Sequence, residues 1–417
     1  MTCAPSTPVH RDAVHVQPLP RVLLVTAEPP QSGTAGGIAL QRLFSDYPAD
    51  RLLVISNARV PAGASTLGCK YVHHPLAVDR LHRTRFWPWR NRLSVAGLAS
   101  LLPLGRPTRA AQAFQPDVVL TLFQDSWYYT LAARLAAKLS RPQVVLIHDL
   151  PHLFEPVSPP SQPQQIQRDA RLLKAATARL FISDGMQRWC RQHYDVDGDV
   201  LLPPAGEQRV RRDRAVEDPE HLLAPGRLTL GYAGGLHYGY GEQLLRLLPA
   251  LRSTGTRLHL FTDRPQGSVA ALARATDVVT WRARQPTPDA TWQRVVEECD
   301  VVLQPYLNPA GPHALQYRTH FPSKLGDLLA LGRPVLMTGP EDASGIAWCR
   351  AHPSSAYCIT SEDPAAVAEA LLRLRNEPSL RRTFAVGATT ASSAFAPVPL
   401  RAQLHEHLRR ASGLTRR

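Results

Sequence analysis

The fold is decided by residues 320–336, which read HFPSKLGDLLALGRPVL. Pro322 cannot lie inside a helix and Ser323 is a good N-cap residue, so a helix is expected to begin here. Leucines give that helix an apolar stripe, and Gly332 and Pro334 end it. The apolar residues that follow predict a buried strand. A loop, a short helix and a buried strand in this order are typical of an α/β domain.

The predicted helix has a cation in its first turn. Lys324 follows the cap, where the positive end of the helix dipole disfavours a lysine by about 0.3 to 1 kcal/mol. This placement is explained if an anion binds at the same point. Asp327 lies one turn further on and can accept hydrogen bonds from a sugar hydroxyl. A phosphate beside a ribose would satisfy both side chains, and a surface helix with a solvated lysine and aspartate is the alternative.

Buried strands recur along the chain before this stretch and again at its end. Short continuous apolar runs predict strands at 21–27, 51–56, 117–123, 143–148 and 179–183, and again at 228–235, 257–262, 277–281, 300–304 and 334–337. Helical segments separate several of them. The alternation predicts an α/β fold of two Rossmann-like, doubly wound parallel-sheet domains that face a central cleft. Because such sheets bind ligands outside the carboxyl ends of their strands, the glycine-rich turns after the first strand of each series are expected to line that cleft.

The domain boundaries follow from the same pattern. We expect a disordered tail at 1–20 and an N-terminal domain at 21–206. Residues 207–226 are charged and contain proline, which suits a linker, and a second domain is expected at 227–395.

Composition indicates a folded protein with an anionic partner. The chain has 417 residues, of which 44% are hydrophobic and 20% are charged, and its formal net charge is +14. Nucleic acid, a membrane surface and a phosphorylated small molecule all suit that charge. No run approaches the roughly 20 apolar residues that span a bilayer, residues 1–20 lack the apolar core of a secretory signal, and the cysteines lack metal-ligand spacing. We therefore expect a cytoplasmic protein with reduced thiols that can still touch a membrane.

Six short motifs carry a family resemblance. They are Gly36-Gly37, FISDGM at 181–186, PAG at 204–206, GYAGG at 231–235, CDVVLQP at 299–305 and the block at 323–336. In this order they resemble the GT-B glycosyltransferases, most closely the family 4 (glycosyl transferases group 1) retaining enzymes of polysaccharide and glycolipid assembly. The resemblance implies an N-terminal acceptor domain and a C-terminal nucleotide-sugar-binding domain. It also implies that residues 396–417 form a helix that crosses back to the N-terminal domain.

The chain departs from this family at two points. The family carries two glutamates, of which the second usually holds the nucleotide ribose; Asp327 stands at the second position and Thr319 at the first. An arginine and a lysine commonly follow the first strand of the second half, where this chain has Gly234 and Gly235. The resemblance therefore implies that Lys324, and with it Arg264, supplies the positive charge for the phosphates.

Candidate substrate-binding residues are assigned on this basis. Lys324 is assigned to the diphosphate and Asp327 to the ribose. The backbone at the double glycine after the first strand is assigned to the space beside the phosphates and the donor sugar, because a side chain would block close approach of the main chain there. An ordinary turn is the alternative for this double glycine, and a solvated loop residue is the alternative for Arg318. The full set is Gly36, Gly37, Gly234, Gly235, Arg264, Arg318, Ser323, Lys324 and Asp327.

His148 and Asp149 join Lys324 as candidate catalytic residues. His148 ends a predicted buried strand and can hydrogen-bond the donor sugar or the acceptor. Asp149 can orient that histidine or act as a base. A histidine with only a structural role is the alternative. No metal is expected, because cations and backbone N–H groups can stabilise a diphosphate without one.

A basic segment precedes the third predicted strand of the first series. Residues 80–116 hold seven arginines and no carboxylate. Arginine interleaved with tryptophan suits the interface of an anionic membrane, and a helix rich in leucine and alanine is expected to follow as far as Leu104. Binding of single-stranded nucleic acid is a weaker alternative, because no nucleic-acid module accompanies the segment. A further alternative is that this arginine-rich segment packs on its own domain. The residues proposed for this membrane and acceptor surface are Arg83, Arg85, Trp87, Trp89 and Arg90.

The sequence thus predicts a glycosyltransferase that moves a sugar from a nucleotide-sugar donor to a saccharide or lipid-linked acceptor, with retention of configuration carried over from the resemblance. Its partners would be these substrates and an anionic membrane surface, with no nucleic acid and no cofactor. A GT-B protein without catalysis that serves a polysaccharide-assembly complex, and a nucleotide-sugar epimerase, are the alternatives. The sequence does not specify the nucleotide base, the sugar, the linkage or the oligomeric state.

Overall fold

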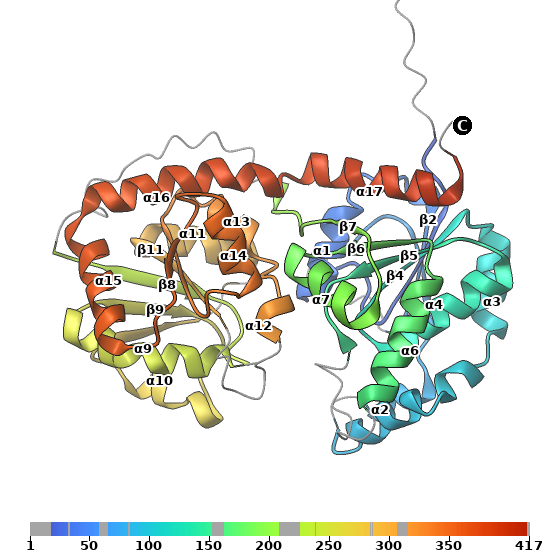
Figure 1. The fold of residues 1–417 in the computed structure, drawn as a ribbon, viewed down its shortest axis with the longest axis horizontal. Helices are drawn as coiled ribbons and strands as arrows, with labels where there is room; N and C mark the ends of the chain where they lie inside the picture. Colours follow the sequence, from blue (N-terminus) through green and yellow to red (C-terminus); the bar gives the residue numbers. More distant parts are fainter. Residues whose placement is uncertain are drawn as a thin grey trace, which may run out of the picture.

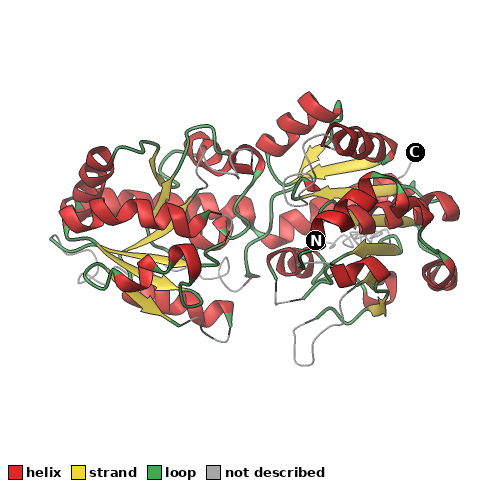
Figure 2. Ribbon diagram, turned by 90° about the horizontal axis from the view of Figure 1, so that it is seen from below, coloured by secondary structure: helices red, strands yellow, loops and turns green. Residues whose placement is uncertain are grey.

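The chain folds into two α/β halves joined side by side (Figure 1). The computed structural model describes residues 18–31, 34–57, 66–81, 84–151, 162–207, 226–237, 239–283, 285, 287–306 and 316–414. Most of the predicted tail and linker therefore lies outside the described residues. Each half is built on one parallel sheet with helices on both faces (Figure 2). This arrangement confirms the predicted fold class.

The N-terminal sheet has seven parallel strands in the order β3-β2-β1-β4-β5-β6-β7. Its central strands are the predicted apolar runs, and the side chains of β1 and β4 are wholly buried because helices cover both faces. The edge strands β3 and β7 were not predicted. The strands are β1 (Val22–Thr26), β2 (Leu52–Ser56), β3 (Lys70–His73), β4 (Val118–Leu122), β5 (Gln143–Ile147), β6 (Ala178–Phe181) and β7 (Asp199–Val200).

Side-chain caps begin several helices of this half. Asp125 accepts hydrogen bonds from Trp127 N and Tyr128 N at the start of α4, and Ser183 accepts one from Met186 N at the start of α7. The α-helices are α1 (Ala35–Leu43), α2 (Trp87–Val95), α3 (Gly105–Phe114), α4 (Ser126–Leu139), α6 (Gln162–Ala175) and α7 (Asp184–Tyr194). The 3-10 helices are η1 (Ala49–Arg51), η2 (Ala77–Leu81) and η3 (Leu98–Leu101).

The C-terminal sheet has six parallel strands in the order β10-β9-β8-β11-β12-β13. In both sheets the chain reverses its direction of winding beside the first strand, between β1 and β4 and between β8 and β11. Such switch points are where open α/β sheets bind ligands. The short last strand β13 was not predicted. The strands are β8 (Thr229–Ala233), β9 (Arg257–Phe261), β10 (Val279–Arg282), β11 (Val301–Pro305), β12 (Val335–Thr338) and β13 (Tyr357–Ile359).

The helices of the C-terminal half pack on both faces of this sheet. The α-helices are α9 (Tyr240–Thr254), α10 (Ala271–Arg274), α11 (Pro288–Glu298), α12 (Gln316–Thr319), α13 (Leu325–Leu329), α14 (Ser344–Ala351), α15 (Pro364–Asn376) and α16 (Pro378–Ala391). The 3-10 helices are η5 (Gly267–Val269) and η6 (Ser392–Phe395).

The last helix, α17 (Pro397–Ser412), packs on the N-terminal half (Figure 1). Leu400, Leu404 and Leu408 are buried in the same apolar cluster as strands β1, β2 and β4. Arg401 pairs with Asp46 of the N-terminal half at 2.9 Å. The end of the chain is therefore part of the N-terminal core.

The two halves also meet directly. One apolar cluster includes Phe181 and Met186 of the N-terminal half together with Phe321 and Ile346 of the C-terminal half. Gly185, in the first turn of α7, lies so close to the C-terminal half that an added Cβ would be 2.5 Å from the backbone oxygen of Arg318. Close backbone contact of this kind fixes where the carboxyl ends of the two sheets stand relative to each other.

Candidate active site

Lys324 lies at the start of a short helix, but the local structure differs from the predicted one. The helix α13 contains five residues, its N-cap position is Lys324 itself, and no side chain caps it. Leu325 N donates to Pro322 O at 2.8 Å, so Ser323 lies inside a tight turn. The predicted Ser323 cap is therefore wrong, because the turn closes through the backbone. A helix this short has a small dipole, so any attraction for an anion comes mainly from the Lys324 charge.

The Lys324 side chain lies against the turn after β8. Its Nζ donates to Ala233 O at 2.8 Å and lies 4.5 Å from the centroid of the Tyr232 ring. A Cβ added to Gly234 would be 2.7 Å from Nζ, and Gly234 has a φ of +155°, so only glycine suits this position. Burial lowers the pKa of Lys324 to about 7. The ammonium group is thus held at the switch point of the C-terminal sheet.

Next to Lys324 is a histidine held by a tyrosine. Tyr240 Oη lies 2.7 Å from His320 Nε2, and the hydroxyl of Tyr306 donates to the backbone oxygen of the same histidine. Burial, with a further contribution from the Lys324 charge, lowers the pKa of His320 to about 4. The imidazole is therefore neutral at pH 7.

Asp327 is buried and occupied by contacts with the N-terminal half. Its Oδ2 lies 3.0 Å from Arg42 Nη1, and its Oδ1 accepts from Gly206 N at 2.9 Å. Arg42 also donates to Pro204 O at 2.9 Å. The carboxylate thus joins α1, the junction between the domains and α13, and its assignment to the ribose stays a prediction.

On the N-terminal side, the double glycine lies inside the first turn of α1. This helix begins at Ala35, because Thr34 Oγ1 accepts from Gly37 N and caps it. A Cβ on Gly37 would be 2.8 Å from that same oxygen, so this glycine is required by the turn. A Cβ on Gly36 would meet only ordinary contacts, and this position faces the side chains of Glu28 and Gln124, both 3.6 Å away.

His148 and Asp149 follow β5 at the same edge of the sheet. Burial lowers the pKa of His148 to about 4. Burial and then the nearby charge of Glu28 raise the pKa of Asp149 to about 6. Among the described residues no hydrogen bond joins the two side chains, so Asp149 does not orient His148 in this structure. Burial and then the charge of Asp149 raise the pKa of Tyr240, which places this carboxylate near the C-terminal half.

The remaining predicted substrate residues are exposed or have structural partners. Arg318 is exposed, and its Nε donates to Asp342 Oδ2 at 2.9 Å. Arg264 is exposed after the end of β9. Gly235 O accepts from the Tyr232 hydroxyl at 2.5 Å, which closes the turn after β8. Their roles in substrate binding stay predictions.

The predicted membrane surface is only partly exposed. Arg90 is 1% exposed and pairs with Asp125 at 2.7 Å, so its assignment to a membrane contact is wrong. Arg83 lies outside the described residues. Arg85 and Trp89 are exposed and Trp87 is half-buried. The predicted helix as far as Leu104 instead ends at Val95, because Gly97 adopts a φ of +87° and a 3-10 helix follows.

Sequence reasoning missed four residues of this region. Glu28 and Gln124 follow β1 and β4, and their position at the carboxyl ends of central strands was a usable signal. Tyr240 and Arg42 lie on helices, and their partners are distant in sequence, so no local pattern indicates them. Within the described part of the chain, no group of three or more His, Cys, Asp or Glu side chains can hold a metal ion.

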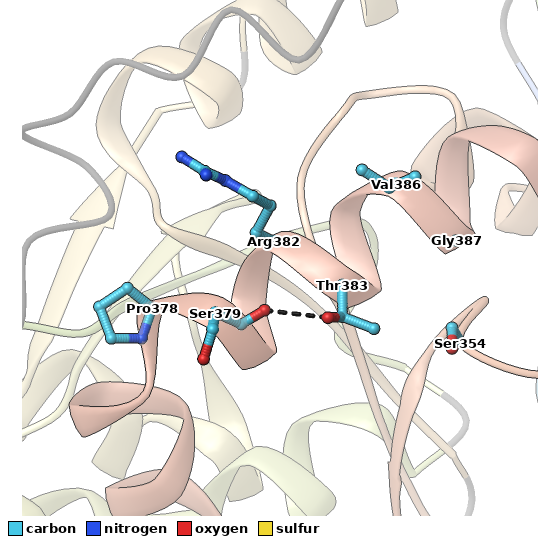
Figure 3. A pocket seen from close by; sticks show the side chains of 7 residues that line it. All are labelled: Ser354, Pro378, Ser379, Arg382, Thr383, Val386 and Gly387. Atoms are coloured by element: carbon cyan, nitrogen blue, oxygen red, sulfur yellow. Dashed lines mark hydrogen bonds between the residues drawn. The ribbon is translucent and has the colours of Figure 1, made fainter.

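A depression of 730 Å³ lies elsewhere, beside α16 (Figure 3). Thr383 Oγ1 donates to Ser379 O at 3.0 Å on its wall. Gly387 lies against Ser354, because an added Cβ would be 2.2 Å from Ser354 O. Its lining contains none of the candidate residues and a single charged side chain, so it is not assigned to the reaction. The lining residues are Ser354, Pro378, Ser379, Arg382, Thr383, Val386 and Gly387.

No protein-family model and no curated protein sequence matches the chain. Solved structures do resemble it. HepE of Anabaena in complex with UDP and glucose has 15% identity and a TM-score of 0.64, over 93% of this chain and 99% of HepE. Sucrose-phosphate synthase of Thermosynechococcus elongatus has 14% identity and a TM-score of 0.66, over 94% of this chain and 99% of that chain. WaaG, a glycosyltransferase involved in lipopolysaccharide biosynthesis, has 14% identity and a TM-score of 0.58, over 93% of this chain and 99% of WaaG. The chain therefore has the GT-B fold, with its two Rossmann-like domains.

Proposed function

We propose that the protein is a glycosyltransferase that moves a hexosyl group from a nucleotide-sugar donor to a saccharide or lipid-linked saccharide. The observation that carries the proposal is the contact of Lys324 Nζ with Ala233 O at 2.8 Å, at the switch point of the C-terminal sheet. A cation beside a glycine turn at such a point suits a diphosphate. The similarity to HepE, whose structure contains UDP and glucose, supports this assignment.

Lys324 would act on the leaving group. Negative charge develops on the diphosphate as the bond to the sugar breaks, and an ammonium group in a partly buried position stabilises that charge more than one in water. Gly234 lets the phosphates approach the backbone at this point. The proposed chemistry needs no protein nucleophile, no cofactor and no metal. Retention of configuration is part of the proposal and rests on the family resemblance.

The N-terminal half would hold the sugar and the acceptor. Glu28, Gln124 and Asp149 follow three neighbouring strands and offer hydrogen-bond acceptors for hydroxyl groups. His148 is neutral at pH 7 and can donate or accept one hydrogen bond with each ring nitrogen according to its tautomer. We propose that Asp149, whose pKa is raised to about 6, accepts a hydrogen bond from the incoming hydroxyl.

The test is release of nucleoside diphosphate from UDP-glucose and from the GDP, CDP and ADP sugars, with and without a saccharide acceptor. Acceptor-dependent release supports transfer. Release without acceptor indicates hydrolysis or epimerase chemistry instead. Loss of release in Lys324→Ala, with an unchanged fold, ties the activity to this site.

A second candidate function is a binding partner without catalysis in a polysaccharide-assembly complex. The observation that favours it is that both carboxylate oxygens of Asp327 already have partners, Arg42 and Gly206. The residue predicted to bind the ribose is therefore engaged in a contact within the protein. Failure of every nucleotide to bind would support this second function and contradict the first.

The location is also a proposal. No helix in the described residues is long and apolar enough to cross a membrane. We propose a cytoplasmic enzyme that associates with the surface of the cytoplasmic membrane, since a lipid-linked acceptor would be presented there.

A further inference from the structure

Helix α2 buries three polar residues and exposes the tryptophan Trp89. Arg90, Asn91 and Ser94 are the buried face, with exposures of 1%, 1% and 0%. At 100° per residue, Trp89 and Arg92 lie on the opposite side of the helix, and both are exposed. An ordinary surface helix has the reverse arrangement.

The buried face is held by directional polar contacts. Arg90 Nη2 lies 2.7 Å from Asp125 Oδ2 and 3.3 Å from Asp79 Oδ1. Arg168 Nη1 donates to Ser94 Oγ at 2.7 Å. These bonds fix α2 to the start of α4 and to α6, while the Trp89 side chain stays exposed. The apolar groups are therefore exposed because the helix packs on the domain through its polar face.

The exposed groups form what we term the α2–η3 surface, which consists of Arg85, Phe86, Trp89, Arg92, Leu98 and Leu101. Phe86, Trp89, Leu98 and Leu101 are 44%, 57%, 40% and 76% exposed. In a 3-10 helix residues three apart share a face, so both leucines of η3 point the same way. Four large exposed apolar side chains, of which Phe86 caps α2, Trp89 lies on α2 and two lie on η3, are more than the isolated exposed residues of an ordinary surface.

The same surface is positively charged. Arg85 lies 4.8 Å from the centroid of the Phe86 ring and Arg92 lies 5.6 Å from that of Trp89. Residues 80–116 contain no carboxylate at all. Aromatic rings with arginines over them match the boundary of an anionic bilayer, where the ring enters the acyl region and the guanidinium stays with the phosphates.

We propose that the α2–η3 surface docks on an anionic lipid bilayer, with Trp89 and Leu101 as the inserted side chains and Arg85 and Arg92 as the lipid-phosphate contacts. The inference rests on the proposed function in one respect: a lipid-linked acceptor would be the reason for the protein to bind a membrane. Docking itself needs neither donor nor acceptor. Its failure would leave nucleotide binding at Lys324 untouched, and loss of nucleotide binding would leave docking untouched.

The test is flotation of the full chain with vesicles of phosphatidylcholine mixed with phosphatidylglycerol, and with phosphatidylcholine alone. We expect binding to the anionic vesicles, weakened by added salt. A basic residue near such a surface contributes a factor of about five in partitioning, so Arg85→Gln with Arg92→Gln should reduce binding about twenty-five-fold. Trp89→Ala with Leu101→Ser should reduce it on both vesicle types.

Matched variants separate docking from folding. Arg92→Gln should leave the melting temperature unchanged while it weakens binding. Arg90→Gln, one helix face away, should lower the melting temperature because it leaves Asp125 without its partner. Trp281→Ala, an exposed tryptophan of the C-terminal half, should leave vesicle binding unchanged.

Three results would overturn the proposal. One is absence of binding by the folded wild-type chain to anionic vesicles. Another is binding that Trp281→Ala reduces as much as the Trp89 and Leu101 variant does. The third is a concentration-dependent dimer, seen by light scattering, that Trp89→Ala dissociates, since this surface would then belong to a second copy of the chain.

Discussion

Arg42 Nη1 lies 3.0 Å from Asp327 Oδ2, and this ion pair connects the helix that begins at the Gly36 turn with the helix that begins at Lys324. The two residues are separated by most of the chain and belong to different domains. Gly206 N completes the contact at 2.9 Å. The pair therefore ties the two candidate halves of the site to the junction between the domains.

We predict that Arg42→Ala lowers the free energy of unfolding by about 3 kcal/mol, because it leaves a buried carboxylate without its charged partner. Urea unfolding at pH 7 measures this change. Arg191→Ala removes an arginine from an exposed pair with Asp197 and should leave the melting temperature unchanged. If the two substitutions changed the stability equally, the Arg42–Asp327 pair would contribute no more to stability than an exposed ion pair.

The pH dependence of nucleotide binding should follow Lys324. Burial lowers its pKa from 10.5 to about 7, whereas a bound diphosphate favours the charged form and raises it. UDP affinity should therefore fall as the pH rises from 7.5 to 9.5, by at most about tenfold per unit. Titration calorimetry at several pH values measures the affinity. Lys324→Arg stays charged over this range, so its affinity should be flat with pH, and a wild-type affinity independent of pH would contradict the assignment.

The unliganded protein should show the opposite trend in stability. Between pH 7 and 10.5 the unfolded chain keeps a proton on Lys324 that the folded chain has lost. The contribution of this group to stability therefore rises with pH across that range. The difference in melting temperature between the wild type and Lys324→Met over the same pH range measures this contribution. A contribution that falls with pH would mean that the lysine is charged in the folded protein.

Tyr240→Phe tests the contact that holds His320. It removes the hydroxyl 2.7 Å from Nε2 and should lower the free energy of unfolding by about 1 kcal/mol. Chemical denaturation measures this change. Tyr357→Phe is the matched control, because the Tyr357 hydroxyl makes no hydrogen bond to any described residue. If the two variants were equally stable, the tyrosine would not restrain the imidazole.

Leu404→Ala tests the docking of α17 on the N-terminal half. Leu404 is 0% exposed among the core residues of the first sheet, and its truncation should lower the free energy of unfolding by about 2 to 5 kcal/mol. Val398→Ala, on the same helix but 59% exposed, should have little effect. A Leu404→Ala protein as stable as the wild type would show that α17 does not dock in solution.

The sequence predicted those parts of the fold that depend on local patterns. The ten predicted runs correspond to ten strands of the described residues, because strands buried on both faces of a parallel sheet are mostly apolar. The edge strands β3 and β7 and the last strand β13 were missed, since they are short and only partly buried. The Ser323 cap was wrong because a backbone turn took its place.

The candidate site was predictable only where its residues follow strands or turns. Lys324 and Gly234 belong to recognisable turns, and the structure brings them into contact. The partners of Asp327 and Arg90 depend on tertiary contacts across the chain, which no spacing in the sequence reveals. The pattern of arginine and tryptophan near residue 90 marked the right helix but not which side of it faces the solvent.

The most direct test of the central claim is a thermal-shift measurement with UDP, GDP, CDP and ADP on the wild type, Lys324→Ala and Lys324→Arg. A ligand that binds only the folded state stabilises it by about 2.7 kcal/mol at a hundredfold excess over Kd. We expect one base to raise the melting temperature of the wild type, no shift in Lys324→Ala, and a partial shift in Lys324→Arg. A wild-type shift that Lys324→Ala retains in full would contradict the claim that Lys324 binds the diphosphate.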